Sequence, residues 1–284
     1  MVSPDEHLEN AQEKKKLVYS CIFGNNARRG DRREVTSSNK YLELLSLLLK
    51  SYVIYGVPSN NIEYLVICNL SVKSEVEKLF ETFNINGKTW CLEPQTLIEQ
   101  YSLRLKIFEY PNINKYSKLL YLDTDILLTG KIDKILDFEL DNKLYALQEG
   151  LTNDKGSDNW WGKSFFEQFS EQNPNVSGFN SGILLFNNHI KIDRLFSSIN
   201  QHIKEHIENK LPILPFLDQP FIVYHAVKND MYNNTSLYRP LIEVNPCSLN
   251  HETIICHFPG GPGDYSSKIV KMQNYMNNIM LKDN

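Results

Sequence analysis

Apolar segments in the first half of the chain alternate with amphipathic ones, and this alternation limits the fold more than any other feature of the sequence. The apolar segments cover residues 17–23, 62–68, 88–92 and 118–128. Such runs are typical of strands that are buried on both faces of a sheet. The segments between them have apolar residues at helical spacing and cover residues 39–52, 71–83 and 95–110. We therefore expect an α/β fold, with a mainly parallel central sheet flanked by helices.

The second half of the chain is less regular. Further apolar runs predict strands at residues 144–149, 179–187 and 253–258. The spacing of apolar residues predicts helices at 191–208, at 216–227 and from Tyr265 onward. We expect a flexible polar N-terminus over 1–16, a single domain over 17–264, and a C-terminal helix over 265–284 that packs on the domain or extends from it.

The composition argues against several classes of protein. The chain has 284 residues, of which 42% are apolar, and this is enough to bury a large core. Its net charge of −4 argues against a general nucleic-acid surface, which needs a basic face. The N-terminus lacks the apolar centre of a secretion signal and no stretch is long enough to span a membrane, so we expect a cytoplasmic protein without membrane contact. The cysteines form no Cys-x-x-Cys pair, which favours reduced thiols at Cys21, Cys68, Cys91, Cys247 and Cys256.

Two aspartates, Asp123 and Asp125, stand inside the fourth apolar run. Parallel sheets bind their ligands beyond the carboxyl ends of the strands, so these carboxylates fall where a ligand site is expected. The side chains of Asp123 and Asp125 can converge on one cation if the chain turns at this point. Hard oxygen ligands suit Mg²⁺ or Mn²⁺. An isolated Asp-x-Asp is also typical of a solvated turn, so the pair needs support from elsewhere in the chain.

That support comes from the segment HFPGGPG, in which His257 also follows an apolar run. The glycines after it, Gly260, Gly261 and Gly263, allow the backbone to approach a phosphate closely. Taken alone, the histidine is typical of a structural residue and the glycines of a turn. Together with the aspartates they favour a metal site beside a phosphate site.

The sequence resembles glycosyltransferase family 8, which includes glycogenin and galactinol synthase. The segment RLKIFEYPNINKYSKLLYLDTDILLTGKIDKIL is similar to a helix, strand and metal motif of that family, and FNSGILLFN, LDQPF and HFPG follow in the family's order. The resemblance covers residues 17–263. It implies a GT-A nucleotide-sugar transferase fold and a retaining hexosyltransferase that moves glucose or galactose from a UDP-sugar to an acceptor hydroxyl. The acceptor would be a sugar, a polyol or a protein, and a homodimer is left open.

The resemblance also implies roles for individual residues. Asp123, Asp125 and His257 would hold Mn²⁺, with Mg²⁺ as the alternative, on the diphosphate of the donor. Asp218 and Gln219 match the pair that lies beside the anomeric carbon, and Arg104 resembles a basic residue near the phosphates or the donor sugar. The other donor-binding residues implied by the match are Phe23, Gly24, Asn25, Tyr41, Thr124, Glu149, Asn180, Ser181, Gly182, Gly260, Gly261 and Gly263.

The chain departs from the family at the end of the last motif. Gly263 stands where the family has a lysine, and the proline and tryptophan that follow the lysine there are absent. Lys268, five residues further on, is our candidate for the missing cation. A second unusual segment is the basic loop around Arg28–Arg33, which we interpret either as a solvated surface or as a lid that closes over the diphosphate.

Two other classes of protein stay open. Phosphatases of the haloacid dehalogenase type also have Asp-x-Asp after an apolar strand. They place it near the start of the chain and have threonine or valine where this chain has Leu127. A nucleotide-sugar binding protein without activity is the other alternative, because the ending of HFPGGPG is altered.

Overall fold

The central element of the structure is a mainly parallel sheet, as expected. The computed structural model describes residues 14–24, 38–152, 161–168, 176–214, 216–233, 241–248, 250–260 and 265–282. Within these ranges, seven strands form one sheet in the order β3-β2-β1-β4-β7-β6-β8. The bounds are β1 (Lys15–Ile22), β2 (Ile62–Cys68), β3 (Gly87–Cys91), β4 (Tyr116–Leu122), β6 (Leu144–Leu151), β7 (Ser177–Asn187) and β8 (Tyr232–Asn233). The strands from β3 to β4 run parallel to one another, whereas β7 runs antiparallel to both β4 and β6.

A small second sheet lies beside the first. It contains β5 (Ile126–Leu128), β10 (Ile255–His257) and β9 (Ile242–Val244), in the order β5-β10-β9. The strands β5 and β10 pair in antiparallel register, which places His257 opposite Ile126. This pairing joins segments that are far apart in the sequence, and it places the start of the HFPGGPG segment beside the turn that contains the two aspartates.

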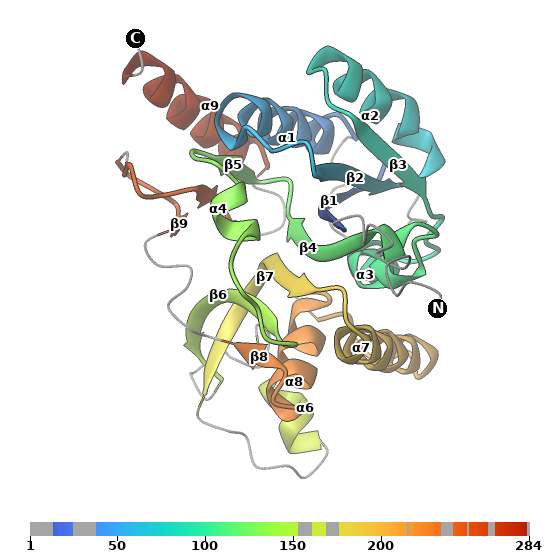
Figure 1. Cartoon of the computed structure of the whole chain (residues 1–284). Coiled ribbons are helices and arrows are strands. Elements are labelled where there is room, and N and C mark those ends of the chain that lie inside the picture. The colour runs from blue at the N-terminus through green and yellow to red at the C-terminus, as the bar shows by residue number, and fades with distance from the viewer. Residues whose placement is uncertain are drawn as a thin grey trace, which may run out of the picture.

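Helices cover both faces of the central sheet (Figure 1). The α-helices of the described ranges are α1 (Ser38–Ser51), α2 (Leu70–Thr82), α3 (Leu97–Ser102), α4 (Asp133–Leu136), α6 (Lys163–Gln168), α7 (Ile190–Glu208), α8 (Gln219–Lys228) and α9 (Tyr265–Lys282). Alternate residues of β1 point to opposite faces of the sheet. Tyr19 lies in a buried cluster with Phe196 of α7 and Phe221 of α8, whereas Val18 lies in a second cluster with Leu45 of α1. The apolar run of β1 is therefore buried on both faces.

Several expected elements differ in their ends. The segment 118–128 is not one strand, because β4 ends at Leu122 and the chain turns before β5. The segment 95–110 is not one α-helix, because α3 passes into a 3₁₀ helix, η2 (Leu103–Glu109), just before Pro111. Helix α1 continues into a π-helical turn, η1 (Tyr52–Gly56), and a short 3₁₀ turn, η3 (Ile113–Lys115), precedes β4. The short elements α4, α6, β5, β8 and β9 were not expected.

The described part of the chain begins close to the first strand. Strand β1 begins at Lys15, and residues 1–13 lie outside the described ranges. Helix α9 begins at Tyr265, as the sequence predicts, and packs on α1 and β5. Residues Arg28–Arg33 also lie outside the described ranges. Among the helices that are described, none has the length and apolar character needed to cross a membrane.

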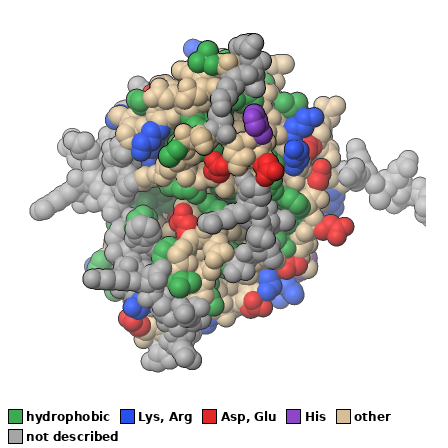
Figure 2. Space-filling model, turned by 90° about the vertical axis from the view of Figure 1, so that its left-hand side faces the viewer, with side chains coloured by type: hydrophobic (Ala, Val, Ile, Leu, Met, Phe, Trp, Pro, Cys, Tyr) green, Lys and Arg blue, Asp and Glu red, His purple; other side chains and the backbone are tan. Residues whose placement is uncertain are grey.

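The surface carries both signs of charge. On the face that lies to the left in Figure 1, acidic and basic side chains are interspersed around a recessed strip of hydrophobic side chains (Figure 2).

All five cysteines are free thiols.

Candidate metal and donor-binding site

Asp123, Asp125 and His257 meet at one point of the structure. Each offers one ligand atom, and these atoms lie within 4.8 Å of one another. The aspartates lie in the turn between β4 and β5, and His257 ends β10. Backbone hydrogen bonds hold the turn in place: the Asp123 N–H donates to the Gly182 carbonyl at 2.8 Å, and the Phe258 N–H donates to the Asp125 carbonyl at 2.9 Å. The turn that follows β4 therefore lets both carboxylates face the same histidine.

The atoms of this cluster fit a divalent cation. Asp125 Oδ1 and His257 Nδ1 are buried and form no hydrogen bond, but Oδ1 has an ion-pair contact of 3.3 Å with His257 Nε2. His257 Nδ1 is therefore the more costly of the two atoms to leave unsatisfied. A Cβ atom at Gly182 would lie 2.7 Å from Asp123 Oδ2 and 2.8 Å from His257 Cε1. Glycine at this position therefore leaves room where a side chain would press on the ligand atoms.

Lys268 of α9 also reaches the cluster. Its ammonium lies 2.6 Å from Asp125 Oδ2, and His257 Nε2 lies 3.3 Å from Asp125 Oδ1. Burial raises the pKa of the Asp125 carboxyl, but the charges of His257 and Lys268 more than offset it, so that pKa lies well below its ordinary value. Burial lowers the pKa of His257, and the Asp125 carboxylate reverses this and raises it above its ordinary value. Asp125 is thus held as a carboxylate.

Arg104 and Asp218 form a buried ion pair next to the cluster. Arg104 Nε donates to Asp218 Oδ2 at 2.8 Å, and a second guanidinium nitrogen donates to Asp218 Oδ1 at 2.7 Å. The guanidinium also donates to the backbone carbonyl and the hydroxyl of Ser181, at 2.7 and 2.8 Å. Arg104 Nη1 also lies 3.6 Å from Asp123 Oδ1. Burial raises the pKa of Asp218 even though Arg104 lowers it.

Tyr121 contacts both Asp123 and Arg104. It was not among the residues predicted for the site. Its hydroxyl donates to Asp123 Oδ1, and the Arg104 guanidinium carbon lies 4.9 Å from the centre of its ring. A signal was present in the sequence: Tyr121 stands two positions before Asp123, so a strand places both side chains on the same side.

The donor-binding residues implied on β6, β7 and the start of α8 also lie together. Gln219 Oε1 accepts from the Ser181 N–H at 3.0 Å and from the Ser181 hydroxyl at 3.1 Å. Asn180 accepts from the Gly182 N–H at 2.7 Å and donates to Glu149 at 3.4 Å. The structure therefore brings β6, β7 and the start of α8 to one place.

Several of the other residues implied to bind the donor have partners of their own. The Gly24 N–H donates to the Asn69 side chain at 3.0 Å, and a Cβ atom at Gly24 would lie 2.4 Å from the Ser71 hydroxyl. The Tyr41 hydroxyl lies 3.0 Å from that of Tyr101. Phe23 packs against the core, and Thr124 is buried in the turn between the aspartates. The predicted residues Asn25, Gly261 and Gly263 lie outside the described ranges.

A comparison with protein families decides the identity of this arrangement. The family described as Glycosyl transferase family 8 matches residues 33–262, which is most of the chain. The chain belongs to glycosyltransferase family 8.

Relatives of this family 8 protein include glycosyltransferase GlyB of Streptococcus pneumoniae serotype 4. The two are 29% identical over 166 residues, which cover 53% of this chain and 34% of GlyB. The chain therefore spans about a third of the length of that relative.

Solved structures show the same fold. The galactosyltransferase LgtC, in complex with donor and acceptor sugar analogs, aligns with a TM-score of 0.55 at 14% identity, over 91% of this chain and 95% of LgtC. The bifunctional glycosyltransferase WbbM, in its apo structure, aligns with a TM-score of 0.59 at 14% identity, over 96% of this chain and 52% of WbbM. The family 8 protein thus has the GT-A fold that its sequence predicts.

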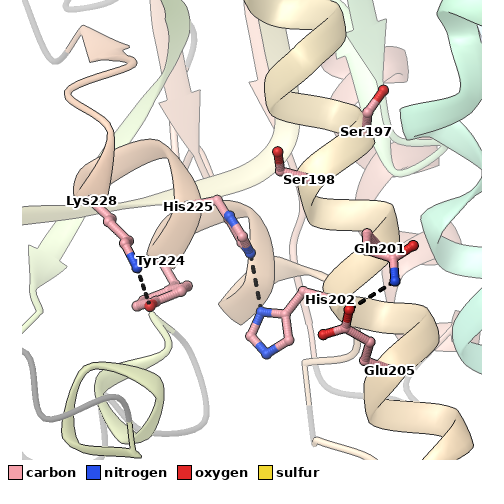
Figure 3. Close-up of a pocket in the computed structure, with 8 residues that line it drawn as sticks. All are labelled: Ser197, Ser198, Gln201, His202, Glu205, Tyr224, His225 and Lys228. Atoms are coloured by element: carbon pink, nitrogen blue, oxygen red, sulfur yellow. Dashed lines mark hydrogen bonds between the residues drawn. The ribbon is translucent and has the colours of Figure 1, made fainter.

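A hollow also lies between α7 and α8 of the family 8 protein (Figure 3). It has a volume of about 460 Å³ and is lined by Ser197, Ser198, Gln201, His202, Glu205, Tyr224, His225 and Lys228. His202 Nδ1 and His225 Nε2 lie 3.1 Å apart, and the Lys228 ammonium donates to the Tyr224 hydroxyl at 3.1 Å. None of the residues predicted to bind the donor lines this hollow.

Proposed function

We propose that this family 8 glycosyltransferase moves a hexose, glucose or galactose, from a UDP-sugar to the hydroxyl of a sugar, polyol or protein acceptor, and retains the anomeric configuration. The observation that supports this most strongly is the convergence of Asp123, Asp125 and His257, whose ligand atoms lie within 4.8 Å of one another. It lies at the end of β4, where a parallel sheet is expected to bind its ligand.

The three ligands suit a divalent cation on the donor diphosphate. Such an ion, when bound, would act as a Lewis acid and stabilise the negative charge that develops on the departing diphosphate. An imidazole beside two carboxylates favours Mn²⁺ over Mg²⁺, because Mg²⁺ prefers oxygen ligands alone. Asp123 has the most exposed side chain of the three, at 38%, and so remains open to the donor.

Arg104 provides a fixed positive charge near the metal ligands. Its guanidinium is held by Asp218 and Ser181, and burial does not neutralise it because the neighbouring carboxylates keep its pKa high. A preorganised charge of this kind stabilises a developing anion without having to move. We assign to Arg104 the stabilisation of charge on the donor phosphates.

Asp218 is the carboxylate that we place nearest the anomeric carbon, with Gln219 beside it. Both oxygens of Asp218 accept hydrogen bonds from Arg104, and only 2% of the residue is exposed. Covalent attack by Asp218 would first require this ion pair to open. The arrangement therefore favours attack by the acceptor on the face from which the diphosphate leaves, with Asp218 as a positioning residue.

The amides and carboxylates at the ends of β6 and β7 suit a sugar. Glu149, Asn180 and Gln219 offer hydrogen-bond donors and acceptors, and each of them is hydrogen-bonded to a residue of the segment 180–182 of β7 or belongs to it. Sugars are recognised through such groups because every hydroxyl both donates and accepts. We assign these residues to the hydroxyls of the transferred hexose.

A panel of UDP-sugars, incubated with Mn²⁺ and without acceptor, tests the proposal. A transferase releases UDP slowly from its own donor, because water replaces the acceptor. A phosphatase of the haloacid dehalogenase type would instead release phosphate from simple monoesters. A binding protein would raise its thermal unfolding midpoint with one UDP-sugar and release nothing. Release of UDP from glucose or galactose donors only in the presence of the ion is the result expected here.

A further inference from the structure

Lys268 takes a position that is unfavourable for a lysine unless it has a specific task. It stands in the first turn of α9, where the helix dipole disfavours a positive charge. Only 8% of the residue is exposed, although lysines are almost never buried without a partner. Its partner is Asp125, one of the three candidate metal ligands, at 2.6 Å.

The backbone that carries Lys268 is firmly anchored. Helix α9 lies alongside α1 (Figure 1), and its next residue, Ile269, is buried. Further along α9, Met272, Tyr275 and Met276 pack against Leu44, Leu127, Cys256 and Phe258. Because the helix is fixed in this way, a change at the site moves the lysine side chain rather than the helix.

Gly260 gives that side chain its room. A Cβ atom at Gly260 would lie 2.9 Å from Lys268 Cε. The family motif has a lysine at the position of Gly263, and Lys268 is our candidate for that missing cation.

From this geometry we propose that Lys268 is an internal cation that occupies Asp125 until a metal ion and a nucleoside diphosphate bind together. The proposal rests on the function proposed above. A metal ion held by Asp123, Asp125 and His257 would share Asp125 with the ammonium, and two cations at one carboxylate repel each other. The ammonium then needs a new anion within reach of its flexible stem, and the diphosphate supplies one. The ion alone has to displace Lys268 without that compensation, so metal and nucleotide favour each other's binding through this residue.

The test compares Lys268→Met with the parent, using Mn²⁺ and UDP as probes and binding as the readout. Loss of the ammonium is expected to tighten binding of Mn²⁺ alone, and to reduce by about tenfold the factor by which Mn²⁺ improves the affinity for UDP. Lys271→Met is the matched control, because Lys271 lies on the same helix and is exposed. Lys268→Arg keeps the charge and should keep most of the coupling.

The outcomes separate the inference from the proposed function. If Lys268→Met is folded by thermal unfolding but binds Mn²⁺ alone no more tightly than the parent does, or retains the full coupling with UDP, the inference is overturned. If the parent itself binds neither Mn²⁺ nor UDP, the proposed function fails. Tighter binding of Mn²⁺ together with weaker coupling, in Lys268→Met but not in Lys271→Met, supports the inference.

Discussion

Arg104 and Asp218 are 114 residues apart in the sequence and form a buried ion pair with two parallel hydrogen bonds, at 2.8 and 2.7 Å. The pair joins η2 to the start of α8, and Arg104 also lies 3.6 Å from Asp123. Both members are more than nine-tenths buried. This ion pair therefore connects η2 and the start of α8 with the residues proposed to bind the metal and the sugar.

Asp218→Asn is expected to destabilise the protein strongly. Breaking a buried pair by removing one charge leaves the other uncompensated, which costs about 3–5 kcal/mol in the free energy of unfolding. Unfolding in urea measures this change. The control is Asp230→Asn, which breaks the exposed pair with Lys143 and should cost less than about 1 kcal/mol. Equal losses in the two variants would show that the Arg104 pair does not hold the fold together.

Gly182→Ala is expected to weaken the metal site with little change in the rest of the fold. The added Cβ would lie 2.7 Å from Asp123 Oδ2 and 2.8 Å from His257 Cε1, so the ligand atoms must shift. We expect the affinity for Mn²⁺ in the presence of UDP to fall by at least about tenfold. Gly130→Ala is the control, because its Cβ would have no neighbour closer than 3.4 Å. Unchanged Mn²⁺ binding by Gly182→Ala would mean that the ion does not bind between Asp123 and His257.

Tyr121→Phe tests a residue that positions a metal ligand. The change removes the hydroxyl that donates to Asp123 but keeps the ring beside Arg104. Loss of such an outer hydrogen bond typically weakens metal binding by about 10–100-fold. Tyr64→Phe removes a buried tyrosine hydroxyl that contacts Ser20, away from the metal ligands, and should leave Mn²⁺ binding unchanged. The same Mn²⁺ affinity in both variants would contradict the role of Tyr121.

His202, which lies on α7 and faces α8, makes the stability of the fold depend on pH. Burial, with a smaller contribution from His206, lowers the pKa of His202 to about 4. The unfolded chain binds a proton at this residue near pH ~6.5, so it holds more protons than the folded chain between these two values. The stability that neutral His202 contributes is therefore complete above about pH 6.5 and is lost as the pH falls toward about 4.

Thermal unfolding at about pH 7 and about pH 5 checks this sign. His202→Gln cannot take up the proton, so its midpoint should fall less between the two conditions than the midpoint of the parent. His251→Gln changes an exposed histidine and should follow the parent. A drop as large in His202→Gln as in the parent would assign the pH dependence to other groups.

Much of the fold could be predicted because its apolar pattern is strong. Residues 191–208 predict α7 almost to its ends, since the apolar stripe of that helix faces the core along its whole length. The turn after Leu122 could not be placed with the same certainty. Both β4 and β5 are apolar and buried, so periodicity does not show that the chain changes sheet between them. Only the two aspartates mark the turn.

The clustering of the three candidate metal ligands could be predicted from the sequence, but the contacts of the candidate site could not. Asp123, Asp125 and His257 meet as expected, because β5 and β10 pair. The pairing of Asp218 with Arg104 and of Asp125 with Lys268 depends on how η2, α8 and α9 pack, and no local pattern encodes that. Tyr121 was missed because an aromatic residue in a buried strand is typical of a core position.

Titration of Mn²⁺ in the presence of UDP, into the parent and into Asp123→Ala and Asp125→Ala, tests the central claim most directly. Each of these carboxylates is proposed to hold the ion that the leaving diphosphate needs. We predict one Mn²⁺ per chain in the parent, and loss of both this binding and Mn²⁺-dependent UDP release in each variant, by well over about tenfold. Binding and release within about tenfold of the parent in both variants would contradict it.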